Sequence, residues 1–187
     1  MVTALIILGV LVGLALIIGL WLMGVYNGLV RLRQAVKNAW AQIDVQLKRR
    51  HDLIPNLVNT VKGYASHEKD TLERVLNARA KATSVTLPAD KIKAEGELSS
   101  ALSRLLAVSE AYPDLKANQS FMSLQQELTT TEDRVSLSRQ TYNDAATRLN
   151  TSIQVFPNVL IAGTFGFNEE PLFETRGEER HAPKVQF

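Results

Sequence analysis

The sequence predicts an all-α membrane protein in which one N-terminal transmembrane helix is continuous with a long-helix antiparallel four-helix bundle. Three observations predict this fold class. An uncharged apolar run fills the N-terminal region, apolar residues recur further along at alternating steps of three and four, and only 10 Gly and 6 Pro occur among 187 residues. The length beyond the apolar run suits a single domain with one hydrophobic core.

Residues 4–25 are apolar and uncharged. About 22 residues at 1.5 Å each span roughly 33 Å, which matches a hydrocarbon core of about 30 Å. A secretory signal peptide would carry basic residues before the apolar run and small residues at a cleavage site, whereas this run ends in Trp21, Met23 and Tyr26. The sequence therefore predicts a retained anchor over residues 1–26, with Trp21 and Tyr26 at the membrane interface.

Charges beside the anchor favour one orientation in the membrane. The first charged residue is Arg31, and basic residues outnumber acidic ones over the next two dozen positions. The positive-inside rule therefore favours a single-pass protein with its amino terminus outside and its C-terminal domain in the cytoplasm. The opposite orientation is the alternative.

Gly9 and Gly13 form a G-x-x-x-G pair within the apolar run. Such a pair permits close approach of two membrane helices and therefore contact between copies of the chain. The alternative is that glycine is simply common in membrane helices.

A helix over residues 27–64 is predicted by an apolar stripe. The stripe consists of Leu29, Val36, Trp40, Ile43, Leu47, Ile54, Leu57, Val61 and Tyr64. Arg33 and Arg50 interrupt it. Pro55 removes one backbone hydrogen bond at a cost of about 3 kcal/mol, but the stripe keeps its phase on both sides, so the sequence predicts a kinked helix and not two helices.

Two shorter helices are predicted over residues 67–84 and 88–112. Ser66 is placed to cap the first. Pro88 falls in the first turn of the second, where its missing N–H costs little, and Tyr112 ends that helix because a proline follows.

The last long helix is predicted over residues 119–156 by a heptad pattern typical of a coiled coil. Its positions hold Phe121, Leu124, Leu128, Thr131, Val135, Ser138, Tyr142, Ala145, Leu149, Ser152 and Phe156. Short connections make successive helices antiparallel, so residues 27–156 are expected to form an up-down-up-down bundle.

This topology returns the chain to the membrane after residue 156. Residues 157–187 are expected to comprise an apolar membrane-proximal segment and an extended tail. The residues expected at the bilayer surface are Leu160, Ile161, Phe165 and Phe167. Two interpretations of the apolar segment stay open: it enters the interface or a contact between copies, or it folds back to cap the bundle.

Arg50 is the polar residue that stands out, because it occupies the apolar stripe. Antiparallel pairing of the two long helices places it within reach of Glu132 and Asp133. A buried ion pair that fixes helix register is one interpretation; an arginine stem on the stripe with its head in water is the other. The residues expected in helix packing are Gly9, Gly13, Trp40, Arg50, Pro55, Glu132, Asp133 and Tyr142.

Reactive constellations are missing from the sequence. There is no cysteine, His67 lacks the second histidine of an H-E-x-x-H site, and the single E-x-x-H match is Glu178–His181, beyond the bundle. Phosphate-loop, dinucleotide and serine-hydrolase signatures are absent as well. We therefore expect no catalytic residue, cofactor or metal, and the near-balanced net charge of +2 indicates no nucleic-acid partner.

The chain resembles the LemA family of bacterial membrane proteins along most of its length. The resemblance rests on Tyr26-Asn27, on Ala39-Trp40-Ala41-Gln42-Ile43-Asp44-Val45-Gln46-Leu47-Lys48-Arg49-Arg50, on Asp52-Leu53-Ile54-Pro55-Asn56-Leu57-Val58, on Tyr112-Pro113-Asp114-Leu115-Lys116-Ala117-Asn118 and on Phe165-Gly166-Phe167. It implies one N-terminal membrane helix, a helical bundle domain and no enzyme activity. With the charge asymmetry it places the protein in the bacterial inner (plasma) membrane with a cytoplasmic C-terminal domain, or with a periplasmic one as the alternative.

The leading functional hypothesis is a membrane-anchored, non-enzymatic scaffold. It would form homo-oligomers in the lipid bilayer and bind other membrane-associated proteins, in envelope maintenance or stress handling. The alternative is a four-helix module that senses a ligand or signal in a polar pocket lined by Thr131, Ser138 and Ser152.

Overall fold

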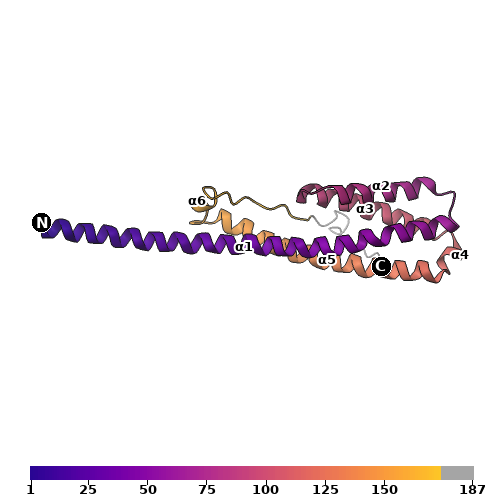
Figure 1. Ribbon diagram of the computed structural model, residues 1–187, viewed down its shortest axis with the longest axis horizontal. Helices are drawn as coiled ribbons and strands as arrows, with labels where there is room; N and C mark the ends of the chain where they lie inside the picture. The colour runs from indigo at the N-terminus through magenta and orange to yellow at the C-terminus, as the bar shows by residue number, and fades with distance from the viewer. Residues whose placement is uncertain (174–187) are drawn as a thin grey trace, which may run out of the picture. The chain divides into compact units, whose positions relative to one another are not determined.

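The computed structural model describes residues 1–173, whose regular secondary structure is helical, with no strand among them. The elements are α1 (Val2–Tyr64), α2 (Lys69–Ser84), α3 (Pro88–Ser109), α4 (Pro113–Lys116), α5 (Gln119–Gln154) and α6 (Val159–Ala162), as Figure 1 shows. The predicted all-α class and the long N-terminal apolar helix are confirmed. The expected extended tail begins at Asn168; its residues 174–187, which include the Glu178–His181 match, lie outside the described residues.

The described chain forms two compact units. Unit 1 comprises Met1–Trp40 and Thr141–Leu172, and unit 2 comprises Ala41–Gln140 with Phe173. The predicted division into residues 1–26, 27–156 and 157–187 stays a prediction.

Unit 1 contains the apolar part of α1. The most apolar window of this helix has a mean hydropathy of 2.9 and buries none of its residues within the protein. Lipid is the solvent that suits such a surface, because in water it would be a large unpaired apolar patch. Beyond this part, the buried side chains of unit 1 come from α1, α5, α6 and the segment after α6: Leu29, Val36, Ala39, Tyr142, Ala146, Leu149, Ile153, Ile161, Ala162 and Phe167.

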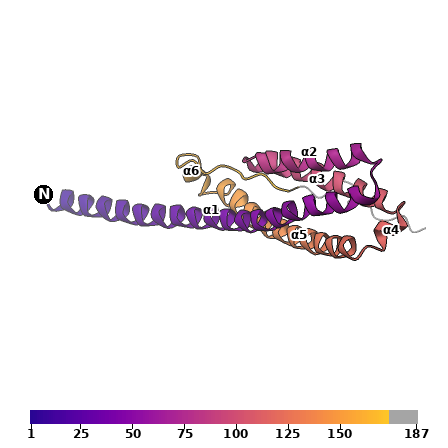
Figure 2. The same cartoon turned by 45° about the vertical axis from the view of Figure 1, so that its right-hand side comes forward.

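Unit 2 is built from the C-terminal part of α1, from α2 and α3, and from the N-terminal part of α5. These four helical segments share one buried apolar cluster that includes Ile54, Leu57, Val61, Leu72, Val75, Leu98, Leu105, Phe121 and Leu128. α2 and α3 lie side by side (Figures 1 and 2), and α4 connects the ends of α3 and α5. This arrangement is consistent with the predicted four-helix bundle.

α1 runs through Pro55 without a break. The prediction of one helix is therefore confirmed, and the kink stays a prediction. Packing compensates for the lost backbone bond, because the neighbouring Ile54 and Leu57 are fully buried in the shared cluster.

Two helix ends differ from the expectation. Ser66 does not cap α2, because the chain first makes a turn in which Glu68 N donates to Ala65 O at 3.1 Å, and Glu68 then precedes the helix without a side-chain cap. α3 ends at Ser109, before Tyr112. The residue before a proline is forced towards extended backbone, and Tyr112 has φ −119° and ψ 90°.

The buried face of α5 drifts from the heptad pattern. Ala146 and Ile153 are buried where Ala145 and Ser152 were expected, whereas Tyr142 and Leu149 follow the prediction. In a straight α-helix, positions seven residues apart are rotated by about 20° relative to one another. Over several heptads this rotation moves the buried face to the next residue along the chain. Phe156 lies beyond the end of α5 and is 79% exposed, because Pro157 stops the helix.

Candidate functional site

Arg50 is a fully buried charged residue of unit 2, with a side chain that is 0% exposed. Its Nη2 donates to Glu95 on α3, which is also fully buried. Its Nη1 donates to Glu132 on α5 at 2.5 Å and to Ser99 on α3 at 3.1 Å. One guanidinium therefore joins α1, α3 and α5.

His51 extends this cluster from the next position on α1. Its Nε2 lies 2.8 Å from Oε1 of Glu95, and Arg79 Nε on α2 donates to the His51 backbone carbonyl at 2.8 Å. Burial alone would raise the pKa of Glu95, but the hydrogen bond with His51 and the charge of Arg50 outweigh it, so the pKa lies below its ordinary value. The Glu95 carboxylate is therefore held ionised at neutral pH.

The structure decides between the two interpretations of Arg50. The version with its head in water is wrong, because no part of the side chain is exposed. Glu132 is a partner as anticipated. Asp133 is exposed and only borders the adjoining cavity, while Glu95 takes the place expected for an acidic partner. The sequence did not point to Glu95, because the antiparallel pairing considered only the two long helices α1 and α5. Its position three residues before Leu98 nevertheless places it on the buried face of α3.

Acid should destabilise unit 2 in part through Glu95. Its folded-state pKa is below the ordinary 4.5, so its contribution to the free energy of unfolding is complete above that pH and is lost as the pH falls through the folded value. We expect Glu95→Gln to lose less stability than the unaltered protein between about pH 6 and about pH 3, in urea titrations followed by circular dichroism. The exposed Glu73→Gln should keep the original slope; an equal slope in Glu95→Gln would contradict this assignment.

A second cluster lies in unit 1, where the chain after α6 contacts α1. The Tyr26 ring meets Phe165 at 5.1 Å and Phe167 at 5.9 Å between centroids, both edge to face. The Arg33 guanidinium lies 4.7 Å from the centroid of Phe167. Gly166 has φ +67°, a conformation that glycine adopts without strain, and this turn brings both phenylalanines to the tyrosine.

The six residues expected at the membrane surface divide into two groups. Trp21, Tyr26, Leu160 and Phe165 are exposed. Ile161 and Phe167 are 4% and 5% exposed and therefore face protein: Ile161 lies on the buried side of α6, and Phe167 packs against Tyr26 and Arg33. Phe156, which was expected on the heptad pattern, and Val159 are further exposed apolar side chains of this region.

The segment after Phe167 is fastened to α5. Asn150 and Glu170 form two hydrogen bonds: Glu170 N donates to Asn150 Oδ1 at 2.8 Å, and Asn150 Nδ2 donates to Glu170 O at 2.9 Å. Tyr142 donates its hydroxyl to Pro171 O at 2.8 Å, and its ring meets Trp40 edge to face at 5.2 Å. Burial, and then the charge of Glu170, raises the pKa of Tyr142 to about 12.

The polar pocket expected along α5 stays a prediction. Thr131 is buried and its hydroxyl donates to Glu127 O at 2.7 Å, and the Ser152 hydroxyl accepts from Asn158. A cavity of about 260 Å³ lies between α3 and α5; its lining includes Arg50, Ser99, Leu102, Ser103, Leu128, Glu132 and Asp133. Ser138 does not line it.

Gly9 and Gly13 have open space where a Cβ would stand, since no atom lies within 4 Å of that position. Their contact with another membrane helix stays a prediction. Within residues 1–173 no three His, Asp or Glu side chains gather in a way that could hold a metal ion.

The chain matches one protein family and is similar to several known proteins. The LemA family profile matches residues 39–187. Protein LemA of Metamycoplasma hominis is 25% identical over 155 residues, which cover 82% of this chain and 71% of that protein. Magnetosome proteins MamQ 1 and MamQ 2 of Paramagnetospirillum magneticum are each 25% identical over 177 residues, covering 81% of this chain and 65% of theirs. The chain thus spans slightly less than two thirds of the magnetosome relatives, and none of these names denotes an enzyme.

Proposed function

Because this chain belongs to the LemA family and is a membrane protein with a single N-terminal apolar helix, we propose that it is a membrane-anchored, non-enzymatic scaffold. In this proposal the protein self-associates and binds membrane-associated partners in envelope maintenance or stress handling. The observation that carries it is the contact of Phe165 and Phe167 with Tyr26, at the end of the apolar part of α1.

This contact supports a second attachment to the bilayer. Tyr26 marks the expected interface, and the segment that packs on it exposes Phe156, Leu160 and Phe165. Each large apolar side chain moved from water into lipid contributes about 1.5–3 kcal/mol. The chain would then cross the membrane once and touch it twice, which leaves the faces of unit 1 available for a neighbouring copy.

The proposal also includes an orientation. Arg31, Arg33 and Lys37 follow the apolar run closely, and the positive-inside rule then favours the bacterial inner membrane with the helical domain in the cytoplasm. Anionic headgroups of the cytoplasmic leaflet would attract the same side chains.

Single cysteines at positions 160 and 165 test the second membrane contact, since the chain has no cysteine of its own. We expect fluorophores at Leu160→Cys and Phe165→Cys, in liposomes, to be quenched by a lipid-borne quencher and protected from an aqueous one. A fluorophore at Leu76→Cys, an exposed position on α2, is the matched control and should respond in the opposite way. Full aqueous quenching at both test positions would rule out the membrane contact.

The mass of the protein in lipid nanodiscs tests self-association. We expect a discrete oligomer by native mass spectrometry, and Gly9→Ile with Gly13→Ile should shift it towards smaller species if the membrane helices supply the contact. Gly19→Ile is the control, since Gly19 lies outside that G-x-x-x-G pair. A monomer at working concentration would contradict the scaffold.

One observation favours a ligand-sensing module as a second candidate. The cavity between α3 and α5 is lined by Arg50, whose buried Nε has no hydrogen-bond partner among the described residues. A small ligand in this cavity would meet the side chains of Leu102, Leu106 and Leu128 and a fixed charge. A monomeric protein in nanodiscs would favour this candidate over the scaffold.

A further inference from the structure

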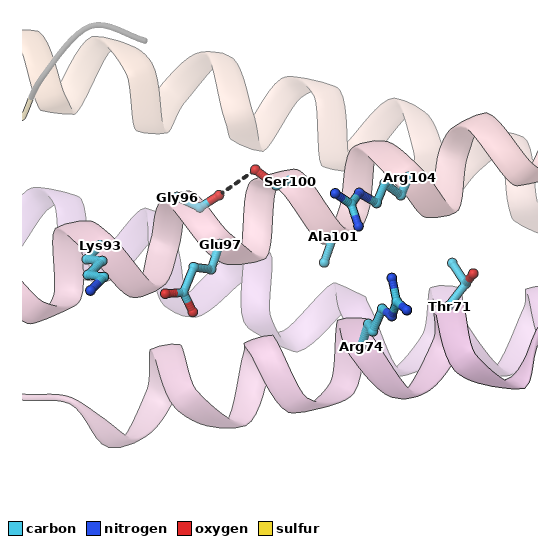
Figure 3. Close-up of a pocket in the computed structure, with 8 residues that line it drawn as sticks. All are labelled: Thr71, Arg74, Lys93, Gly96, Glu97, Ser100, Ala101 and Arg104. Atoms are coloured by element: carbon cyan, nitrogen blue, oxygen red, sulfur yellow. Dashed lines mark hydrogen bonds between the residues drawn. The ribbon is translucent and has the colours of Figure 1, made fainter. Parts of the chain in front are cut away.

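A second, larger cavity lies on the surface of unit 2 between α2 and α3. It has a volume of about 550 Å³, and its lining includes Thr71 and Arg74 from α2 with Lys93, Glu97 and Arg104 from α3. In Figure 3 the Arg74 and Arg104 side chains extend from opposite walls towards the same space. Gly96 has no side chain and Ala101 has only a methyl group, which leaves the space between α2 and α3 open.

The register of the two helices places these arginines opposite one another. Lys81 and Glu97 pair across the groove, with Nζ donating at 2.6 and 2.9 Å to the two carboxylate oxygens. Two turns earlier on α2 and two turns later on α3, the same antiparallel register brings Arg74 opposite Arg104. Lys81 and Glu97 thus bring opposite charges together across the hairpin, whereas Arg74 and Arg104 bring like charges together.

No carboxylate of residues 1–173 neutralises this arginine pair. Among the described residues, neither Arg74 nor Arg104 has an acidic group within 4 Å, and the one carboxylate in the groove lining, Glu97, is held by Lys81. Lys93 adds a further positive charge one turn from Glu97. Like charges directly opposite one another destabilise a pair of elements unless an anion lies between them.

The chemistry of the two side chains indicates which anion fits. Guanidinium groups present a planar fork of N–H donors that matches the oxygens of phosphate, and two forks from opposite walls can hold one phosphoryl group or two linked ones. We propose that the α2–α3 groove is a binding site for a phosphate-bearing ligand, held between Arg74 and Arg104. This site is independent of the membrane scaffold proposed above.

Two probes test the site and distinguish its source of phosphate. The full-length protein in nanodiscs of neutral lipid is titrated calorimetrically with pyrophosphate and with a water-soluble short-chain phosphatidic acid. We expect saturable binding of at least one probe, and about tenfold weaker binding in Arg74→Gln and in Arg104→Gln. Tighter binding of pyrophosphate would indicate a soluble ligand, and tighter binding of phosphatidic acid a lipid headgroup.

The control variant is Arg134→Gln, which removes the same charge from an exposed position on α5, outside the groove. Its affinity should stay within about twofold of the unaltered protein. Absence of saturable binding of both probes, or an equal loss in Arg134→Gln, would overturn the proposal.

A charge reversal gives a readout that does not depend on the choice of probe. Arg74→Glu would face Arg104 and form an ion pair, as Glu97 does with Lys81. We expect this variant to lose binding while its melting temperature stays the same or rises by up to a few degrees. A fall in melting temperature would contradict the placement of the two arginines as opposed like charges.

Discussion

Replacing Arg50 with methionine should lower the free energy of unfolding of the protein by about 3–5 kcal/mol, the cost of breaking a buried ion pair from one side. Glu95 would remain fully buried, with His51 as its one remaining hydrogen-bond partner among the described residues. Methionine fills much of the arginine volume, so a cavity accounts for little of the loss. Urea denaturation of the full-length protein in detergent, followed by circular dichroism, measures the change.

Two further variants isolate the buried charge as the cause. Glu132→Gln should cost about 1 kcal/mol or less, because the Glu132 side chain is 44% exposed and water replaces part of the interaction. Arg50→Met combined with Glu95→Met removes both buried charges and should recover much of the stability, since apolar replacements of a buried pair are often neutral. A loss below about 1 kcal/mol in Arg50→Met alone would show that the cluster contributes little.

Replacing Tyr142 with alanine should lower the free energy of unfolding by about 3–5 kcal/mol, the range found for large aromatic side chains in cores. Tyr142 is 1% exposed, packs edge to face on Trp40 and donates a hydrogen bond to Pro171. The substitution therefore removes the side chain that connects α1, α5 and the segment after α6 within unit 1. Urea denaturation followed by tryptophan fluorescence measures this loss.

Tyr142→Phe is the matched control, because it keeps the ring and removes the hydroxyl. We expect it to cost about 1 kcal/mol. Folding raises the pKa of the Tyr142 hydroxyl from 10.0 to about 12, so its contribution to the free energy of unfolding is complete below pH 10 and is lost as the pH rises through 12. Tyr142→Phe should abolish this loss of stability at alkaline pH. Equal losses in the alanine and phenylalanine variants would assign the whole effect to the hydrogen bond.

Helices and their buried faces could be predicted because they depend on residues close in sequence. Ile43, Ile54 and Leu57 were expected on the apolar stripe of α1, and each is fully buried. Hydrophobic spacing determines which side of a helix turns away from water, whichever partner covers it. A fixed heptad pattern predicts the buried face less accurately towards the end of a long helix, as the shift from Ser152 to Ile153 on α5 shows.

Contacts that need a third helix could not be predicted from pairwise patterns. Glu95 is the main example, since its role depends on α3 approaching Arg50 closely enough to exclude water. The facing arginines of the α2–α3 groove depend on hairpin register, which is seen in the Lys81–Glu97 pair. Neither position carries a motif, so no sequence signature separates it from an ordinary solvated charge.

The sequence by itself determined the helical class, the long N-terminal apolar helix, the family and the burial of most stripe residues, because each follows from local composition and spacing. Only the tertiary structure decided that Arg50 is buried, that Glu95 is its partner and that Phe167 is buried while Phe165 stays partly exposed beside Tyr26. The physical reason is that burial of a charge or a ring depends on what packs over it, and that information is spread over helices distant in the chain.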